Sequence, residues 1–104
     1  MRIHLLGIGG TGMGSLAGLL KEAGHAVTGT DMKLYPPMSD QLASIGIEPF
    51  EGYSAENNAR AKPDLVVIGN VIRRDNPEAQ EVLREGLPCL SMPQALSEIF
   101  LKDR

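Results

Sequence analysis

This sequence of 104 residues lacks features on which several classes of protein depend. It has one cysteine, Cys89, so an internal disulfide is impossible and no metal cluster can rest on thiolates. No apolar run approaches the ~18 residues of a membrane-spanning helix, and no signal peptide is visible. The formal net charge is −3 and no basic cluster occurs, which argues against nucleic acid as a partner. We therefore expect a cytoplasmic protein without membrane or nucleic-acid partners.

The apolar residues fall into short runs that alternate with helical patterns. The runs predict strands at 3–8, 26–31, 47–50, 65–68 and 87–91. Helices are predicted at 13–23 and 93–101. Two more are predicted to begin at a capping residue, one running from Ser39 through 45 and the other from Asn76 through 86. The polar segment 52–62 is either an irregular crossover or a short helix.

Strands that alternate with helices predict one doubly wound, Rossmann-like α/β domain with helices on both faces of the sheet. Its five strands are expected to be parallel, in the order 3-2-1-4-5, with 65–68 beside 3–8. The carboxyl ends of the strands, where this order reverses, are the expected place for a ligand.

A glycine-rich motif follows the first strand. Residues 7–12, GIGGTG, have the G-x-G-x-x-G spacing between a predicted strand and a predicted helix, which is the context that gives this pattern meaning. Gly7 permits a tight turn, Gly9 lets a phosphate approach the backbone, and Gly12 lets helix and strand pack closely. The free N–H groups of the first helical turn would then face an anionic ligand.

An acidic residue, Asp31, ends the second strand nineteen residues after Gly12. In dinucleotide enzymes such a carboxylate accepts hydrogen bonds from a ribose, and the alternative is a solvated carboxylate in a turn. His4 and His25 are interpreted as structural or surface residues, and Cys89 as a small buried apolar residue. No Ser/His/Asp set, paired carboxylates or metal-ligand spacing can be assembled. The sequence thus predicts a binding site with neither catalytic residues nor a metal.

Four stretches carry a resemblance to a known family. They are HLLGIGGTGMGSLA (4–17), VTGTD (27–31), DLVVIGNVIRRDNPE (64–78) and LPCLSMPQALSEIF (87–100). The chain resembles the N-terminal domain of the Mur ligases over essentially its whole length. The resemblance implies that 1–104 is the UDP-N-acetylmuramate-binding domain of a larger three-domain ligase whose ATP-binding and C-terminal domains are absent from this chain.

Two branches of that family are similar to this sequence. The YPPMS run at 35–39 and the segment 68–70 look more like the branch that attaches recycled murein tripeptide, L-alanyl-γ-D-glutamyl-meso-diaminopimelate, in peptidoglycan recycling. The glycine motif and the run up to Glu78 are also similar to the branch that adds L-alanine.

The resemblance also implies roles for individual residues. Asp31 would contact the nucleoside, and Tyr53 stands where the alanine-adding branch usually has a histidine near the uracil. Gly69 and Asn70 replace a usual pair of serines in that branch. The residues expected around the diphosphate are Gly7, Gly9, Gly10, Thr11, Gly12 and Met13.

The family's ATP site requires a G-x-x-G-K-[S/T] loop in its second domain, and this sequence has no such motif. We therefore expect no cofactor in this chain, whereas the parent enzyme would use ATP and Mg²⁺ and bind the tripeptide through its other domains. Two other functions stay open: a nicotinamide-dinucleotide-binding domain of an oxidoreductase or sensor, and a free-standing ligand-binding module.

Overall fold

A computed structural model of the chain describes residues 1–10, 12–32, 34, 36–69, 72–73, 75–95 and 97–98. Its centre is a five-stranded sheet in the order β3-β2-β1-β4-β5, and every pair of neighbouring strands is parallel. The strands are β1 (Arg2–Leu6), β2 (Ala26–Asp31), β3 (Phe50–Glu51), β4 (Leu65–Ile68) and β5 (Cys89–Ser91). The predicted class, direction and order of strands are confirmed.

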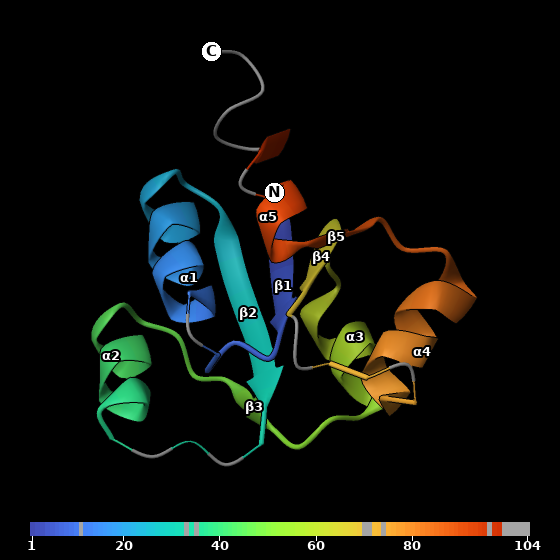
Figure 1. The fold of residues 1–104 in the computed structure, drawn as a ribbon, viewed down its shortest axis with the longest axis horizontal. Helices are drawn as coiled ribbons and strands as arrows, with labels where there is room; N and C mark the ends of the chain where they lie inside the picture. Colours follow the sequence, from blue (N-terminus) through green and yellow to red (C-terminus); the bar gives the residue numbers. More distant parts are fainter. Residues whose placement is uncertain are drawn as a thin grey trace.

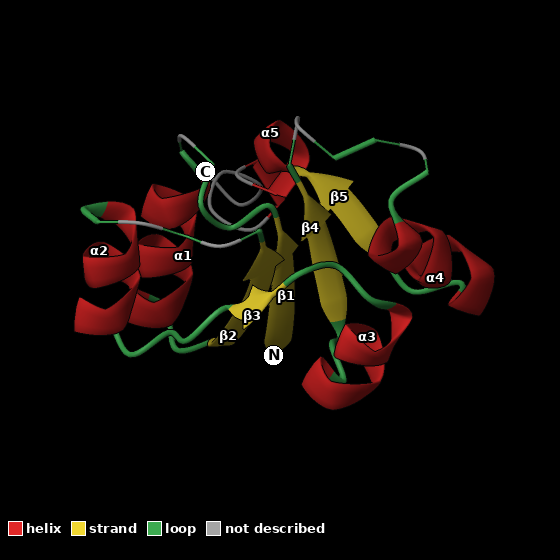
Figure 2. Cartoon of the chain, turned by 90° about the horizontal axis from the view of Figure 1, so that it is seen from below, coloured by secondary structure: helices red, strands yellow, loops and turns green. Residues whose placement is uncertain are grey.

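Helices cover both faces of this sheet. They are α1 (Met13–Glu22), α2 (Met38–Ser44), α3 (Ala55–Ala61), α4 (Pro77–Glu85) and the short α5 (Met92–Ala95). Figure 2 shows the sheet between two layers, with α1 and α2 on one side and α3 and α4 on the other. The chain changes sides after β3, as a doubly wound fold requires.

The residues of β1 explain why the sheet needs two layers. Ile3 and Leu5 lie in the larger core cluster, which also contains residues of α1, α2 and α5. Leu6 points to the opposite face and packs in a second cluster with Val66 and the buried residues of α4. A strand that is buried on both faces is apolar nearly throughout, and His4 is the one polar exception between Ile3 and Leu6.

The register brings the ends of three strands to one edge. Leu6 at the end of β1 pairs with Thr30 of β2 and with Ile68 of β4. The segments that follow β1, β2 and β4 therefore leave the sheet together, at the edge to which the arrowhead of β2 points in Figure 1. The order of strands reverses here between β1 and β4, so this is the edge expected to hold a ligand.

Several element boundaries differ from the predicted ones. The first strand ends at Leu6 because Gly7 turns the chain with a φ of 81°. The third strand is only Phe50–Glu51, since Ile47 is used in the core between sheet and helices. The second helix begins after Pro37, before the predicted cap at Ser39.

Two further regions, the segment 52–62 and the last helix, also bear on the predicted helices. The polar segment 52–62 contains a true helix, α3, whose cap is the Ser54 side chain accepting from the Glu56 amide at 3.2 Å. The last helix, α5 (Met92–Ala95), begins one residue before the predicted 93, and its predicted end at 101 lies outside the described residues. Ala95 is buried as predicted, and the expected inward residues Leu96, Ile99 and Phe100 lie outside the described residues.

Candidate functional site

The glycine motif forms a tight turn that is fastened to the neighbouring strand. The Gly7 amide donates to the Thr30 carbonyl at 2.8 Å, and the Gly10 amide donates back to the Gly7 carbonyl at 2.9 Å. Gly12 has a φ of 86° and immediately precedes α1 as its N-cap residue. Gly7 and Gly12 thus occupy left-handed conformations that favour glycine, the first at the predicted tight turn.

Gly9 lacks a side chain because the protein itself occupies that space. Its amide donates to Asp31 Oδ2 at 2.8 Å. A Cβ on Gly9 would lie 2.4 Å from Leu34 Cδ2 and 2.9 Å from Asp31 Oδ2. The Asp31 carboxylate also accepts from the Met32 amide at 2.7 Å, so it joins the glycine turn to the end of β2.

Two backbone amides at the start of α1 have no acceptor among the residues that the structure describes. The helix has no side-chain cap and no acidic residue in its first turn. Among hydrogen bonds between described residues, the Gly12 and Gly14 amides have no acceptor. Such N–H groups, together with the helix dipole, favour an anion beside the turn.

A cleft of about 450 Å³ opens at the same edge of the sheet, and Asp31, which binds the Gly9 amide, forms part of its lining. It is bounded by the end of β2, by the loop after β3 and by the loop that leads into α4. Its lining consists of Asp31, Met32, Tyr53, Ile72, Arg73, Asp75, Asn76 and Pro77. These described lining residues include an aromatic ring, apolar groups, carboxylates and a guanidinium, a mixture that suits a polar ligand with a flat ring.

Tyr53 remains a neutral hydrogen-bond donor in this cleft. Burial raises the pKa of its phenol well above the ordinary value, and the nearby Asp31 carboxylate raises it further. The Tyr53 hydroxyl lies 3.5 Å from Asp31 Oδ1. A ligand that reaches this wall meets a phenol O–H and a carboxylate side by side.

Beneath the cleft lies a buried polar cluster made of His4, Thr30, Asn57 and Glu78, which the sequence analysis did not find. Glu78 Oε2 lies 2.5 Å from His4 Nε2 and accepts from the Thr30 hydroxyl at 2.7 Å. Glu78 Oε1 accepts from Asn57 Nδ2 at 2.7 Å. Both His4 and Glu78 are completely buried.

The environment keeps Glu78 ionised. Burial alone would raise the pKa of its carboxyl group, but the hydrogen bonds from His4, Asn57 and Thr30 outweigh burial and hold the pKa below its usual value. The one sequence signal for this cluster is a histidine inside an otherwise apolar strand, and its partner Glu78 is 74 residues away.

The predicted diphosphate and nucleoside residues are only partly brought together. Four of them lie at the edge of the sheet where β1, β2 and β4 end, namely Gly10, Gly12, Asp31 and Tyr53. The Met13 side chain is in the core, at 3% exposure. Thr11 and Asn70 lie outside the described residues.

Gly69 lies against the end of β1 and does not line the cleft. Its amide donates to the Leu6 carbonyl at 3.0 Å, and a Cβ there would approach the same oxygen to 3.0 Å. The bare backbone at this position therefore allows the chain after β4 to pass close to β1. The sequence analysis did not choose Arg73, Asn76 or Pro77 as site residues, although all three follow the apolar fourth strand, whose carboxyl end lies at the expected ligand edge.

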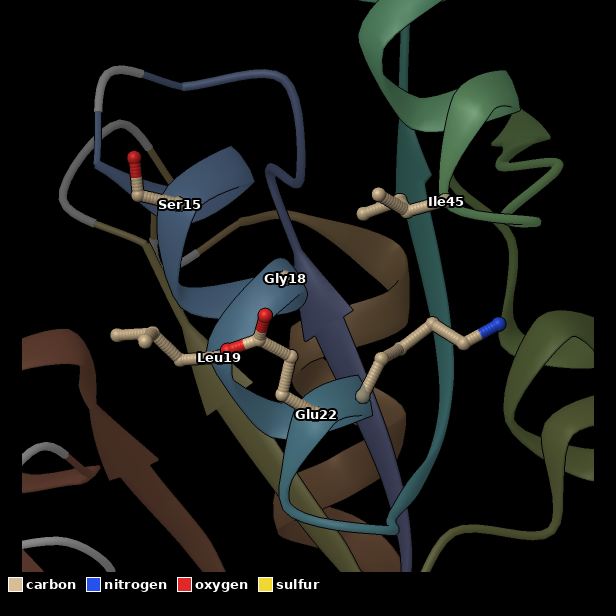
Figure 3. Close-up of a pocket in the computed structure, with 6 residues that line it drawn as sticks. Ser15, Gly18, Leu19, Glu22 and Ile45 are labelled. Atoms are coloured by element: carbon tan, nitrogen blue, oxygen red, sulfur yellow. The ribbon is translucent and has the colours of Figure 1, made fainter.

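A larger hollow, of about 620 Å³, lies on the outer face of α1. Figure 3 shows the Ile45 side chain reaching from the end of α2 toward α1, whereas the Ser15 and Leu19 side chains of α1 point away from Ile45. The polar side chains do not converge on a common point, so this hollow has none of the features of a recognition site.

The described residues provide neither a metal-binding cluster nor a membrane-spanning helix. No group of three or more histidine, cysteine, aspartate or glutamate side chains among them could hold a metal ion. No helix in the same part of the chain is both long and apolar enough to cross a membrane.

Comparisons with known proteins agree with this geometry. The family described as "Mur ligase family, catalytic domain" matches residues 2–104. UDP-N-acetylmuramate–L-alanyl-γ-D-glutamyl-meso-2,6-diaminoheptandioate ligase of Escherichia coli is 50% identical over the whole chain, which covers 22% of that protein. The chain therefore spans about a fifth of the length of the curated relatives it matches.

Solved structures give the same result. The UDP-N-acetylmuramate:L-alanyl-γ-D-glutamyl-meso-diaminopimelate ligase of Neisseria meningitides superposes with a TM-score of 0.91 at 50% identity, over 96% of this chain and 31% of that one. The UDP-N-acetylmuramate–alanine ligase of Thermotoga maritima superposes with a TM-score of 0.87 at 30% identity, over 100% of this chain and 24% of that one.

Proposed function

Because this chain belongs to the Mur ligase family, we propose that it is the N-terminal domain of a larger three-domain ATP-dependent ligase and binds the UDP part of UDP-N-acetylmuramate. The proposed acceptor of the whole enzyme is recycled murein tripeptide. Half of the residues of this chain are identical to those of a ligase named for that peptide. The L-alanine-adding ligase is the second candidate, supported by a TM-score of 0.87 to one such enzyme.

The observation that carries this proposal is the pairing of an open helix N-terminus with a cleft. The Gly12 and Gly14 amides, without acceptors among the described residues, suit the diphosphate. The cleft that begins at Asp31 and Tyr53 suits the nucleoside. Thr11, Gly69 and Asn70 keep the roles that the family resemblance gives them only as proposals.

In this proposal Asp31 acts mainly by holding the turn. Two backbone amides already donate to its carboxylate, at 2.8 and 2.7 Å. A carboxylate offers about four acceptor positions, so a ligand hydroxyl can still be accepted. Loss of Asp31 would therefore disturb the diphosphate turn and the nucleoside cleft together.

The chemical step is assigned to other parts of the whole enzyme. The sequence of this chain contains no G-K-[S/T] loop for the phosphates of ATP. ATP and Mg²⁺ would activate the carboxylate of UDP-N-acetylmuramate for amide formation, and this domain would hold the nucleotide end of the same substrate.

Titration of the 104-residue chain with single nucleotides tests the binding function. We expect UDP-N-acetylmuramate, and UDP more weakly, to shift the amide resonances of Gly10, Gly12, Gly14 and Tyr53 in a saturable way. NADH should leave them unchanged, because five strands do not supply the second mononucleotide-binding half of a dinucleotide fold. ATP should leave them unchanged as well, because the sequence has no G-K-[S/T] loop for its phosphates. Saturable binding of NADH with no response to UDP compounds would reject the proposal.

The acceptor is tested separately on the full-length protein. With UDP-N-acetylmuramate, ATP and Mg²⁺ supplied, we expect phosphate release to depend on the tripeptide and to be negligible with L-alanine. The reverse preference would assign the enzyme to the alanine-adding branch while leaving the proposed nucleotide binding intact.

A further inference from the structure

The buried polar cluster lies directly behind the wall of the cleft. Three pairs of adjacent residues join the cleft lining to the Glu78 carboxylate. Asp31 and Tyr53 line the cleft, while their neighbours Thr30 and Ser54 donate hydrogen bonds to this carboxylate. In the third pair Pro77 lines the cleft, and its neighbour is Glu78 itself. Three segments of the wall, distant in the sequence, thus meet at one buried side chain. Glu78 itself is completely buried and does not line the cleft.

The contacts around Tyr53 show how this carboxylate acts on the wall. The Ser54 amide, next to Tyr53, donates to Glu78 Oε1 at 3.2 Å. On the other side of Tyr53, the Gly52 carbonyl accepts from Asn57 Nδ2 at 3.0 Å, and the same amide group donates to Glu78 Oε1 at 2.7 Å. Both peptide neighbours of Tyr53 are therefore held through Glu78 and Asn57.

We propose that Glu78 is a positioning residue for the nucleotide cleft, holding the segment 52–54 so that Tyr53 faces Asp31. This proposal rests on the nucleotide-binding function proposed above. His4 and Thr30 anchor one carboxylate oxygen to the sheet, and the other oxygen is left for the Tyr53 segment. An apolar side chain could fill this volume but could accept none of these hydrogen bonds.

The variant Glu78→Gln tests the proposal with little change of shape. The amide nitrogen of glutamine cannot accept, so one of the two sets of donors loses its acceptor. We expect the Tyr53 and Ser54 amide resonances of the free 104-residue chain to shift. We also expect the Kd for UDP-N-acetylmuramate to rise about tenfold, which corresponds to about 1.4 kcal/mol.

Asn57 and Asn58 provide a matched pair of variants that leaves Glu78 in place. The two residues are adjacent on α3 and equally buried, at 4% and 3% exposure. Asn57 binds the Glu78 carboxylate, whereas Asn58 Nδ2 donates to the Glu78 backbone carbonyl at 3.1 Å. Asn57→Ala should shift the Tyr53 resonances and weaken nucleotide binding several-fold. Asn58→Ala should lower stability, but it should leave the Tyr53 resonances in place and the Kd for the nucleotide within about twofold of the parent value.

The outcomes separate this proposal from a purely structural role and from the proposed function. Unchanged Tyr53 resonances in Glu78→Gln and Asn57→Ala would overturn it, as would equal effects of Asn57→Ala and Asn58→Ala. If the parent chain did not respond to UDP compounds, the binding function would fail, and the free-protein resonances would still decide the positioning role. If Glu78→Gln did not fold, the asparagine pair would decide alone.

Discussion

The Gly9 amide donates a hydrogen bond of 2.8 Å to the Asp31 carboxylate and so ties the glycine turn to the end of β2. In a dinucleotide-binding fold the acidic residue at this place is expected to face the ribose. Here part of its hydrogen-bonding capacity is used inside the protein, and its other oxygen lies 3.5 Å from the Tyr53 hydroxyl. The turn and the cleft therefore share one carboxylate.

The first prediction concerns Gly9→Ala. Its new Cβ would lie 2.4 Å from Leu34 Cδ2 and 2.9 Å from Asp31 Oδ2, so these side chains must shift and the Gly9–Asp31 hydrogen bond is disturbed. We expect a loss of about 1–3 kcal/mol in the free energy of unfolding, measured by denaturant titration, as for other overpacked sites. Binding of UDP-N-acetylmuramate should weaken as well, because the displaced Asp31 carboxylate both holds the turn and lines the cleft.

Gly18→Ala is the control for that experiment. A Cβ at Gly18, within α1, would meet nothing within 4 Å. Replacing glycine by alanine inside a helix should raise stability by about 0.5–1 kcal/mol and leave nucleotide affinity unchanged. Equal stability losses in the two variants would contradict the close contact assigned to Gly9.

The fold could be predicted because its signals are local. Apolar runs such as 65–68, separated by helical patterns, fix the number, direction and order of the strands once right-handed crossovers are required. The cap at Asn76 and the turn at Gly7 could likewise be predicted from neighbouring residues. Boundaries failed where the core competed with local preference, as at Ile47, which is buried although no strand begins there.

The candidate site was less predictable because its contacts are distant in the sequence. The His4–Glu78 pair joins residues 74 positions apart. The polar segment 52–62 showed no apolar stripe, yet it forms α3, since Asn57 and Asn58 face inward and bind Glu78 rather than an apolar core. A polar helix face with buried partners has no hydrophobic period by which it could be recognised.

A second prediction concerns the pH dependence of stability. The hydrogen bonds from His4, Asn57 and Thr30 hold the pKa of Glu78 below its usual value of 4.5. Its contribution to stability is therefore fully present above that pH and is lost as the pH falls through the lower, folded-state pKa. The free energy of unfolding of the parent minus that of Glu78→Gln should therefore shrink as the pH falls below about 4.5, through the lower, folded-state pKa of Glu78. The other carboxyl groups titrate in both proteins, so a difference that stayed constant down to pH 3 would contradict this account.

The third prediction concerns the cap of α4. Asn76 Oδ1 accepts from the Glu78 and Ala79 amides at 3.0 and 3.1 Å. Asn76→Ala should cost about 1 kcal/mol of unfolding free energy, within a usual range of about 0.5–2, in denaturant titrations. Asn76→Asp keeps an acceptor oxygen at the same place and should be close to the parent. Equal losses in both variants would show that the cap contributes little.

The last prediction concerns Arg73, the cationic residue among the described residues that line the cleft. Asp31 and Asp75 line the same cleft and repel a diphosphate, so among the described residues the favourable charge comes from Arg73 and from the backbone amides of the turn. Arg73 is exposed and forms no salt bridge with a described residue, so its loss should change stability by less than about 0.5 kcal/mol.

Arg73→Ala should therefore weaken UDP-N-acetylmuramate binding by up to about fivefold at low ionic strength, as expected for one exposed charge contact of about 1 kcal/mol. The difference from the parent should shrink in high salt, because exposed charges are screened over a few ångströms. Calorimetric titrations at two salt concentrations measure both effects. The control is Arg84→Ala: Arg84 is exposed on α4, pairs with Glu81 and does not line the cleft, so its loss should leave the affinity unchanged. A loss of affinity equal in the two arginine variants would mean that only the overall charge matters, and the nucleotide would then not be held at this cleft.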